Sequence, residues 1–174
     1  MHLCDRSDVL KLIHSGQMTV DNQLNDVKFL DEHRLALHLT RLYEVQGSVD
    51  LSAADPPYGR HMEVETAELV PGGFYLGITR ERLSFGQDIA ASLHTRSRYA
   101  RLGLEVLCSS NFVVPGFGAT GPAPLVFEIT VRRRTFGLNS DASYCFALIY
   151  QISSPRRQPN VADYNTRFPI PQLT

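Results

Sequence analysis

Leu125-Val126-Phe127-Glu128-Ile129-Thr130-Val131 is the clearest strand pattern in the chain. β-branched and aromatic residues fill it, and such residues are typical of strands. A single carboxylate interrupts the pattern. The alternation puts Glu128 on one face with Val126 and Thr130, which allows it simply to face solvent. In apolar surroundings the same carboxylate is costly unless it has a partner or a task. The residues alone leave both interpretations open.

The rest of the chain predicts further short strands around this one. Apolar residues alternate at positions 35, 37 and 39, which predicts a half-buried strand. Further strands are predicted at 74–79, 105–114 and 144–152. Gly and Pro mark a turn at 71–73, a surface loop at 47–61 and a long turn at 115–122. Many short strands separated by Gly and Pro predict a β-barrel or sandwich.

The two ends of the chain differ from this pattern. Residues 7–17 predict a short helix with Ser7 as its N-cap and Gly16 as its stop. Four prolines follow Ser153, which predicts an extended or mobile tail. The length suits one domain over residues 1–174.

Composition excludes several classes of partner. The formal net charge is −1, so we expect no attraction to a nucleic acid polymer or to a membrane surface. No apolar run approaches the ~20 residues of a membrane span. The three cysteines, Cys4, Cys108 and Cys145, are too scattered for a disulfide framework. They indicate reduced thiols in a cytoplasmic protein.

Zinc-dependent nucleobase deaminases combine an H-x-E segment with a P-C-x-x-C segment to hold the metal. This combination is absent from the chain, and so are C-x-x-C and H-E-x-x-H. A deaminase built from this sequence would therefore have to activate water without zinc.

Several segments resemble the dCTP deaminases of the trimeric dUTPase superfamily. The run Arg96-Ser97-Arg98-Tyr99-Ala100-Arg101-Leu102-Gly103-Leu104 is similar to the family's R-S-S-L-A-R-L-G-L signature. The opening 1–6, the run 69–77, the Pro115-Gly116-Phe117 turn and the Phe127-Glu128 pair also match in order and spacing. The resemblance implies a mainly β, distorted barrel or jelly-roll with a short N-terminal helix. It also implies a homotrimer with active sites at subunit interfaces.

The resemblance further implies hydrolytic deamination of a pyrimidine nucleotide, dCTP or a close relative, to the uracil nucleotide and ammonia. Glu128 matches the family's general base and acid, a role that one carboxylate with a tuned pKa can perform. Ser97 and Arg101 match the residues that hold and polarise the attacking water. Taken without the family, Ser97 and Arg101 would more simply be read as a solvated surface turn.

Other positions match the family's substrate contacts. Arg96 matches a phosphate-binding arginine, and Arg98 replaces a serine, where its guanidinium could contact phosphate. The stretch with Ser109, Ser110 and Asn111 lies where the family's backbone reads the base. Mg²⁺ is expected to accompany the nucleotide phosphates and to take no part in the ring chemistry.

Two positions depart from the family. Val114 replaces an aspartate that accepts a hydrogen bond from the sugar 3′-hydroxyl, so we expect weaker binding of an ordinary deoxynucleotide. In the tail, Tyr164 matches the phosphate clamp but its lysine, glycine and glutamine are missing. These losses keep two alternatives open: a non-catalytic nucleotide-binding module and, less favoured, a diphosphohydrolase of dUTPase type.

Overall fold

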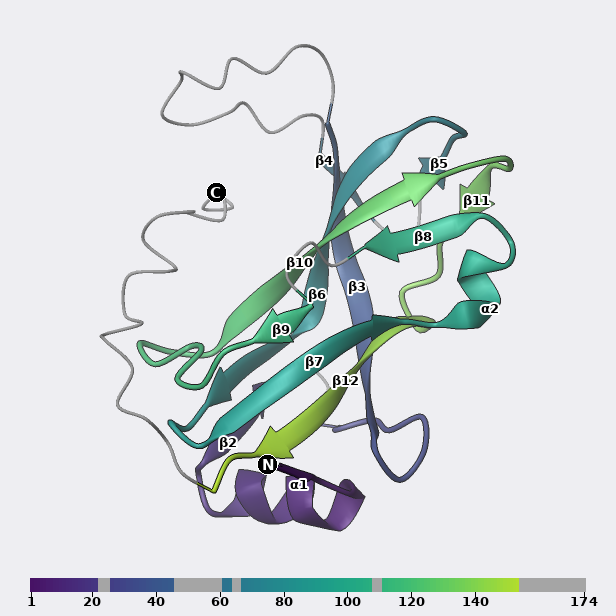
Figure 1. The fold of residues 1–174 in the computed structure, drawn as a ribbon. Coiled ribbons are helices and arrows are strands. Elements are labelled where there is room, and N and C mark those ends of the chain that lie inside the picture. Colours follow the sequence, from purple (N-terminus) through teal and green to yellow (C-terminus); the bar gives the residue numbers. More distant parts are fainter. Residues whose placement is uncertain (22–25, 46–60, 64–66, 108–110, 154–174) are drawn as a thin grey trace.

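The computed structural model describes residues 1–21, 26–45, 61–63, 67–107 and 111–153 (Figure 1). A ten-stranded antiparallel sheet runs in the order β8-β10-β6-β3-β12-β7-β9, with β1, β2 and β4 beside β12, β6 and β3. A second, two-stranded sheet joins β5 and β11. The strands are β1 His2–Leu3, β2 Met18–Asp21, β3 Arg34–Glu44, β4 His61–Glu63, β5 Glu68–Leu69, β6 Phe74–Phe85, β7 Ile89–Thr95, β8 Leu104–Leu107, β9 Phe112–Val113, β10 Ala123–Val131, β11 Phe136–Gly137 and β12 Ser143–Gln151.

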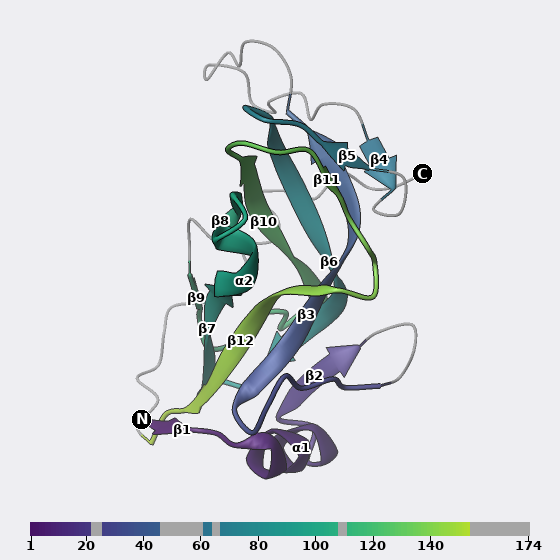
Figure 2. The same cartoon turned by 90° about the vertical axis from the view of Figure 1, so that its right-hand side faces the viewer.

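The large sheet is strongly curled. Strands β7 and β8 lie near opposite ends of the hydrogen-bonding order, yet the short helix α2 (Ser97–Ala100) connects them directly. Figures 1 and 2 show the β8–β10–β6 part and the β12–β7–β9 part facing in different directions, with α2 beside β7 and β8. The prediction of a mainly β, distorted barrel or jelly-roll with an N-terminal helix is confirmed.

The core lies inside this curl. Alternate residues of β10 point inward, and Phe127 and Ile129 are almost fully buried there. Every second residue of a strand faces the same side, so both parts of the sheet contribute apolar side chains. The largest fully buried side chains are Tyr75, Phe127, Met18, Leu35, Leu37, Leu39, Leu42, Leu69, Leu83, Ile89, Leu104 and Ile129.

Helix α1 (Arg6–His14) corrects the prediction at its N-terminus. Asp5, and not Ser7, is the N-cap, because its carboxylate accepts a hydrogen bond from the backbone N–H of Asp8 at 2.9 Å. Gly16 follows the C-cap Ser15 with a φ of 73°, as expected for a glycine that ends a helix. Val9 and Leu12 anchor the helix to the core.

Strand β3 was predicted to be half-buried, and this is wrong. Ala36 and His38, which lie between the predicted inward residues, are also buried. The alternation of apolar residues predicted one buried face correctly. The second face is also covered, and Ala36 and His38 carry no sign of this in their own sequence pattern.

Other boundaries shift by a few residues. Strand β6 continues to Phe85, well past the predicted end at 79. The predicted strand at 105–114 consists of two, β8 and β9, on different parts of the sheet. The predicted strands around 125–131 and 144–152 are present as β10 and β12, and 115–122 is a turn. Of the predicted loop at 47–61, residues 47–60 lie outside the described residues, whereas His61 begins β4. The predicted tail lies outside them from residue 154 on.

Cys4 is a free, buried thiol, and Cys145 is also buried. Burial, aided by the nearby Asp8 carboxylate, raises the pKa of Cys4. Cys108 lies outside the described residues. No helix within the described ranges is long and apolar enough to cross a membrane.

Candidate active site

Glu128 lies in the middle of β10, on the outer face of the sheet. It is paired with Leu76 of β6 on one side and Leu107 of β8 on the other. Its neighbours along the outer face are Val126, which is 39% exposed, and Thr130, which is half-buried. The sequence left open whether Glu128 faces solvent or lies in apolar surroundings. In the single chain its side chain points to the outer face of the sheet. Glu128 itself is only partly exposed.

The outer face around Glu128 carries several apolar side chains beside the polar Thr130 and Glu105. Phe74 on β6 pairs with Thr130 and is 38% exposed, Leu76 is half-buried, and Ile78 is buried. Large apolar side chains that remain exposed next to each other on a folded surface often mark a contact site.

Ser97, Arg98 and Arg101 lie on and just after α2, and all three are exposed. The backbone N–H of Arg101 donates to the carbonyl of Ser97 at 3.0 Å, so a single helical turn holds the two residues together. The guanidinium of Arg98 lies 5.2 Å from the centroid of the Tyr99 ring. The signature segment thus presents a hydroxyl and two guanidinium groups at the surface.

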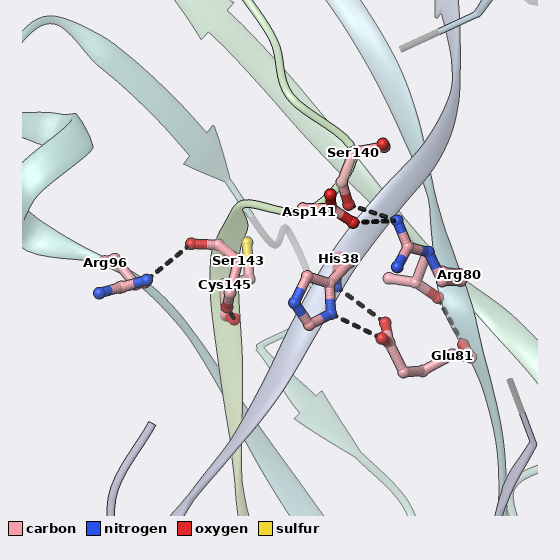
Figure 3. Close-up of polar contacts among 9 residues, drawn as sticks. His38, Arg80, Glu81, Arg96, Ser140, Asp141, Ser143 and Cys145 are labelled. Atoms are coloured by element: carbon pink, nitrogen blue, oxygen red, sulfur yellow. Dashed lines mark hydrogen bonds and ion pairs between the residues drawn. The ribbon is translucent and has the colours of Figure 1, made fainter. Parts of the chain in front are cut away.

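Arg96, just before α2, has a structural role that its sequence did not reveal. Its backbone N–H donates to the carbonyl of Tyr144, and its side-chain Nη1 donates to the carbonyl of Ser143 at 3.0 Å (Figure 3). The ring of Tyr99 packs at a tilt against the ring of Tyr144, with 4.7 Å between the ring centroids, and burial raises the pKa of Tyr144. These contacts fasten the signature segment to β12, so α2 starts from a fixed position.

Glu128 and α2 lie at opposite ends of β8. Leu104, at the start of β8 next to α2, pairs with Val131, whereas Glu128 pairs with Leu107 at the far end. Three residues of strand span about 10 Å. The fold therefore sets the predicted acid–base residue apart from Ser97 and Arg101 along one strand.

The remaining predicted contacts lie around β9. Asn111 is exposed, and its carbonyl accepts from the backbone N–H of Leu93 at 2.7 Å. Val114 is half-buried at the start of the 115–122 turn, and its carbonyl accepts from the backbone N–H of Phe117. Ser109, Ser110 and Tyr164 lie outside the described residues.

In the part of the chain that the structure describes, no group of three or more His, Cys, Asp or Glu residues is placed to hold a metal ion. The sequence does contain one H-x-E triplet, His61-Met62-Glu63, which forms β4. The P-C-x-x-C half of the zinc signature has no counterpart.

Comparison with known families identifies the family to which the chain belongs. A family model described as dCTP deaminase-like matches residues 5–151, which include α2, β8 and β10. The chain belongs to the dCTP deaminase-like family. The segments that carried the resemblance, from Arg96 to Leu104 and around Glu128, lie inside the matched range.

Curated relatives of this dCTP deaminase-like chain are consistent with this family. The dUMP-forming dCTP deaminase of Nocardioides sp. is 29% identical over 177 residues, covering 97% of this chain and 90% of the relative. The protein of the same name from Kocuria rhizophila is 32% identical over 130 residues, covering 75% of this chain and 58% of the relative.

Solved structures confirm the fold. The 2′-deoxycytidine 5′-triphosphate deaminase of Agrobacterium tumefaciens superposes with a TM-score of 0.66 at 18% identity, over 85% of this chain and 47% of that one. This chain thus spans about half the length of the Agrobacterium chain. A native EIAV dUTPase superposes with a TM-score of 0.51 at 12% identity, over 82% and 95% of the two chains. The dUTPase-like architecture is therefore shared by this dCTP deaminase-like chain.

Proposed function

We propose that this protein hydrolytically deaminates a cytosine nucleotide, dCTP or a close relative, to the uracil nucleotide and ammonia. The observation that carries the proposal is the position of Glu128. In a chain whose family match spans 5–151, this carboxylate lies on the outer face of the sheet beside Leu76 and close to the exposed side chains of Phe74 and Val126. A carboxylate at such a place is a candidate for proton transfer.

The chemistry needs one proton carrier. Water adds through its oxygen to C4 of the cytosine ring while the Glu128 carboxylate takes one of its protons. The same carboxyl passes this proton to ring N3, then takes the proton of the new C4 hydroxyl and gives it to the amino group as C4=O forms, the C4–N bond breaks and ammonia leaves. A carboxyl with a raised pKa can act in both steps. Zinc is not required by this route.

Ser97 and Arg101 are proposed to hold and polarise the water. The Ser97 hydroxyl fixes the orientation of the water, and the Arg101 guanidinium stabilises the negative charge that develops in the transition state. Arg96 and Arg98 are proposed to contact the nucleotide phosphates, with Mg²⁺ bound to those phosphates as part of the substrate. Because Arg96 already donates to Ser143, its phosphate contact would use its remaining N–H groups.

A homotrimer is proposed to complete the site. Within one chain, β8 separates Glu128 from Ser97 and Arg101, and the outer face around Glu128 exposes the apolar side chains of Phe74 and Val126. A second copy docked on this face would cover these side chains. It would also bring its own α2 towards the carboxylate, so each site would combine residues of two subunits.

A second activity is favoured by one observation. The curated relatives reported above are named dUMP-forming. Forming dUMP from dCTP consumes two waters and releases ammonia and pyrophosphate. Val114 argues against efficient hydrolysis of the phosphate chain, because it replaces the aspartate that helps to orient the attacking water in dUTPases.

Product analysis separates these activities. Purified protein with Mg²⁺ would be incubated with dCTP, CTP and dCMP, and ammonia, pyrophosphate and nucleotides would be measured. Ammonia without pyrophosphate supports the deaminase alone, and both products from dCTP support dUMP formation. Folded protein that releases no ammonia from any of the three contradicts the proposal and favours a non-catalytic binding module.

A further inference from the structure

Thr79, Arg80 and Glu81 form a bulge within β6. At this point the pairing of β6 shifts in register, both with β10 and with β3. On the β10 side, Val126 pairs with Ile78 and Pro124 pairs with Arg82, so the single residue Leu125 faces three residues of β6. On the β3 side, the register also shifts, between Leu39 and Arg41. A bulge of this kind leaves backbone groups without ladder partners.

Side chains from this segment satisfy those groups. The Thr79 hydroxyl accepts from the backbone N–H of Leu125 at 2.8 Å and donates to the carbonyl of Glu81 at 2.7 Å. The Glu81 carboxylate accepts from the backbone N–H of His38 at 2.8 Å. Thr79, Glu81 and His38 are almost fully buried. Since a buried N–H needs an acceptor, Thr79 holds β10 and Glu81 holds β3.

Arg80 points the other way and adds a third connection. Its Nη2 donates to the carbonyl of Ser140 in the segment before β12, and it lies 3.9 Å from a carboxylate oxygen of Asp141 (Figure 3). Three consecutive side chains thus tie β6 to β10, β3 and the approach to β12.

The bulge determines where Glu128 lies along β6. Beyond the bulge, Ala123 pairs with Leu83; without the shift, continuing that register would place Glu128 opposite Ile78 in place of Leu76. The difference is two residues, or about 7 Å along the strand, with the same face outward. The contact between Thr79 and Leu125 lies three residues from Glu128, at the start of the ladder that carries it.

We propose that Thr79 is a positioning residue for Glu128, whose hydroxyl fixes the register of β10 against β6 and so the place of the acid–base carboxylate. This inference rests on the proposed deaminase function. Thr79 itself makes no contact with the substrate in this proposal. Its effect should fall on the chemical step, because a small displacement of a catalytic group lowers the rate more than it lowers substrate binding.

Three variants test this role. Thr79→Val keeps the shape and removes the hydroxyl, Thr79→Ser keeps the hydroxyl, and Ile149→Val removes one methyl from the core of β12, away from the bulge. We expect Thr79→Val to lower kcat for ammonia release about 10- to 100-fold with KM little changed. Thr79→Ser should stay close to wild type, as should Ile149→Val. A kcat for Thr79→Val equal to that of Ile149→Val would overturn the inference.

Amide hydrogen exchange separates this inference from the proposed function. In the wild type, the Leu125 amide should exchange as slowly as the ladder amides beside it, and in Thr79→Val it should exchange faster while β12 is unaffected. If the wild type releases no ammonia, the proposed function fails, and the exchange result alone decides the role of Thr79. Exchange of Leu125 at loop-like rates in the wild type overturns that role even if Thr79→Val does not fold.

Discussion

Glu81 accepts two hydrogen bonds from His38, one from its backbone N–H at 2.8 Å and one from its ring Nδ1 at 2.7 Å. Both residues are 4% exposed, although they lie 43 residues apart in the sequence. A carboxylate only accepts, so Nδ1 carries the proton in this pair. The pair fastens β3 to β6 next to the bulge that precedes Glu128.

Removing the carboxylate should therefore be costly. Glu81→Ala leaves the His38 N–H and ring buried without their acceptor and should lower the free energy of unfolding by about 3–5 kcal/mol. Glu81→Gln keeps one acceptor oxygen and should cost about 1 kcal/mol. Urea unfolding measures both. The exposed pair of Glu105 with Arg132, at 2.8 Å, provides the control: Glu105→Ala should cost less than about 1 kcal/mol. Equal losses in the two alanine variants would contradict the role of the buried pair.

The turn at 115–122, which the glycines and prolines predicted, joins two strands that do not pair with each other, and its contacts are structural. The carbonyl of Phe117 accepts from the backbone N–H of Phe85 at 2.8 Å, and Gly118 has a φ of 68°. A Cβ added at Gly118 would lie 2.5 Å from the carbonyl oxygen of Leu83. The turn is thus packed directly on the end of β6.

Alanine at two glycines of this turn should separate backbone strain from close packing. Gly121, with a φ of 146°, has nothing within 4 Å of an added Cβ, so Gly121→Ala should cost only the backbone strain of about 1–3 kcal/mol. Gly118→Ala adds a clash with Leu83 and should cost more. Thermal unfolding compares the two, and a smaller loss at Gly118 would contradict the packing.

The sequence predicted β10 and β12 well, because each is a short run of β-branched, aromatic and other apolar residues. It missed what depends on distant partners. No residue near His38 in the sequence indicates that a distant carboxylate, Glu81, will accept its hydrogen bonds. The bulge in β6 likewise depends on residues of three different strands, His38, Thr79 and Leu125. The N-cap moved from Ser7 to Asp5 because either side chain is suitable and only the geometry selects one.

The candidate site also combines features that local motifs predict with features that depend on distant contacts. The identity of Ser97, Arg101 and Glu128 was predicted from local motifs, whereas their separation along β8 follows from register, which motifs do not encode. The tie between Arg96 and Ser143 was likewise not predictable, because it joins α2 to a strand 47 residues away.

Restoring the aspartate at Val114 should improve the binding of deoxynucleotides. Val114 is half-buried beside β9, and its side chain has no group that accepts a hydrogen bond. If the sugar lies there, Val114→Asp should lower KM for dCTP about fivefold, which corresponds to about 1 kcal/mol. The matched control is 2′,3′-dideoxycytidine triphosphate, which lacks the 3′-hydroxyl and should show no gain. An equal gain for both nucleotides would place the effect elsewhere.

Mixing two inactive variants tests whether subunits share the site. Glu128→Gln and Arg101→Ala chains would be unfolded, mixed in equal amounts and refolded together. If each site takes Glu128 from one subunit and Arg101 from the next, about a quarter of the sites are intact in random trimers. Ammonia release should then return to about that fraction of wild type. A mixture as inactive as its parents, with trimers present, would indicate that each site lies within one chain.

The most direct measurement is the rate of ammonia release from dCTP by the wild type and by Glu128→Gln, in chelator-treated protein supplied only with Mg²⁺. Glutamine keeps the size of the side chain and removes its ability to take and return a proton. The account predicts ammonia from the wild type and a rate at least about 100-fold lower from the variant, with equal thermal stability. A variant that releases ammonia as fast as the wild type would contradict Glu128 as the acid–base residue.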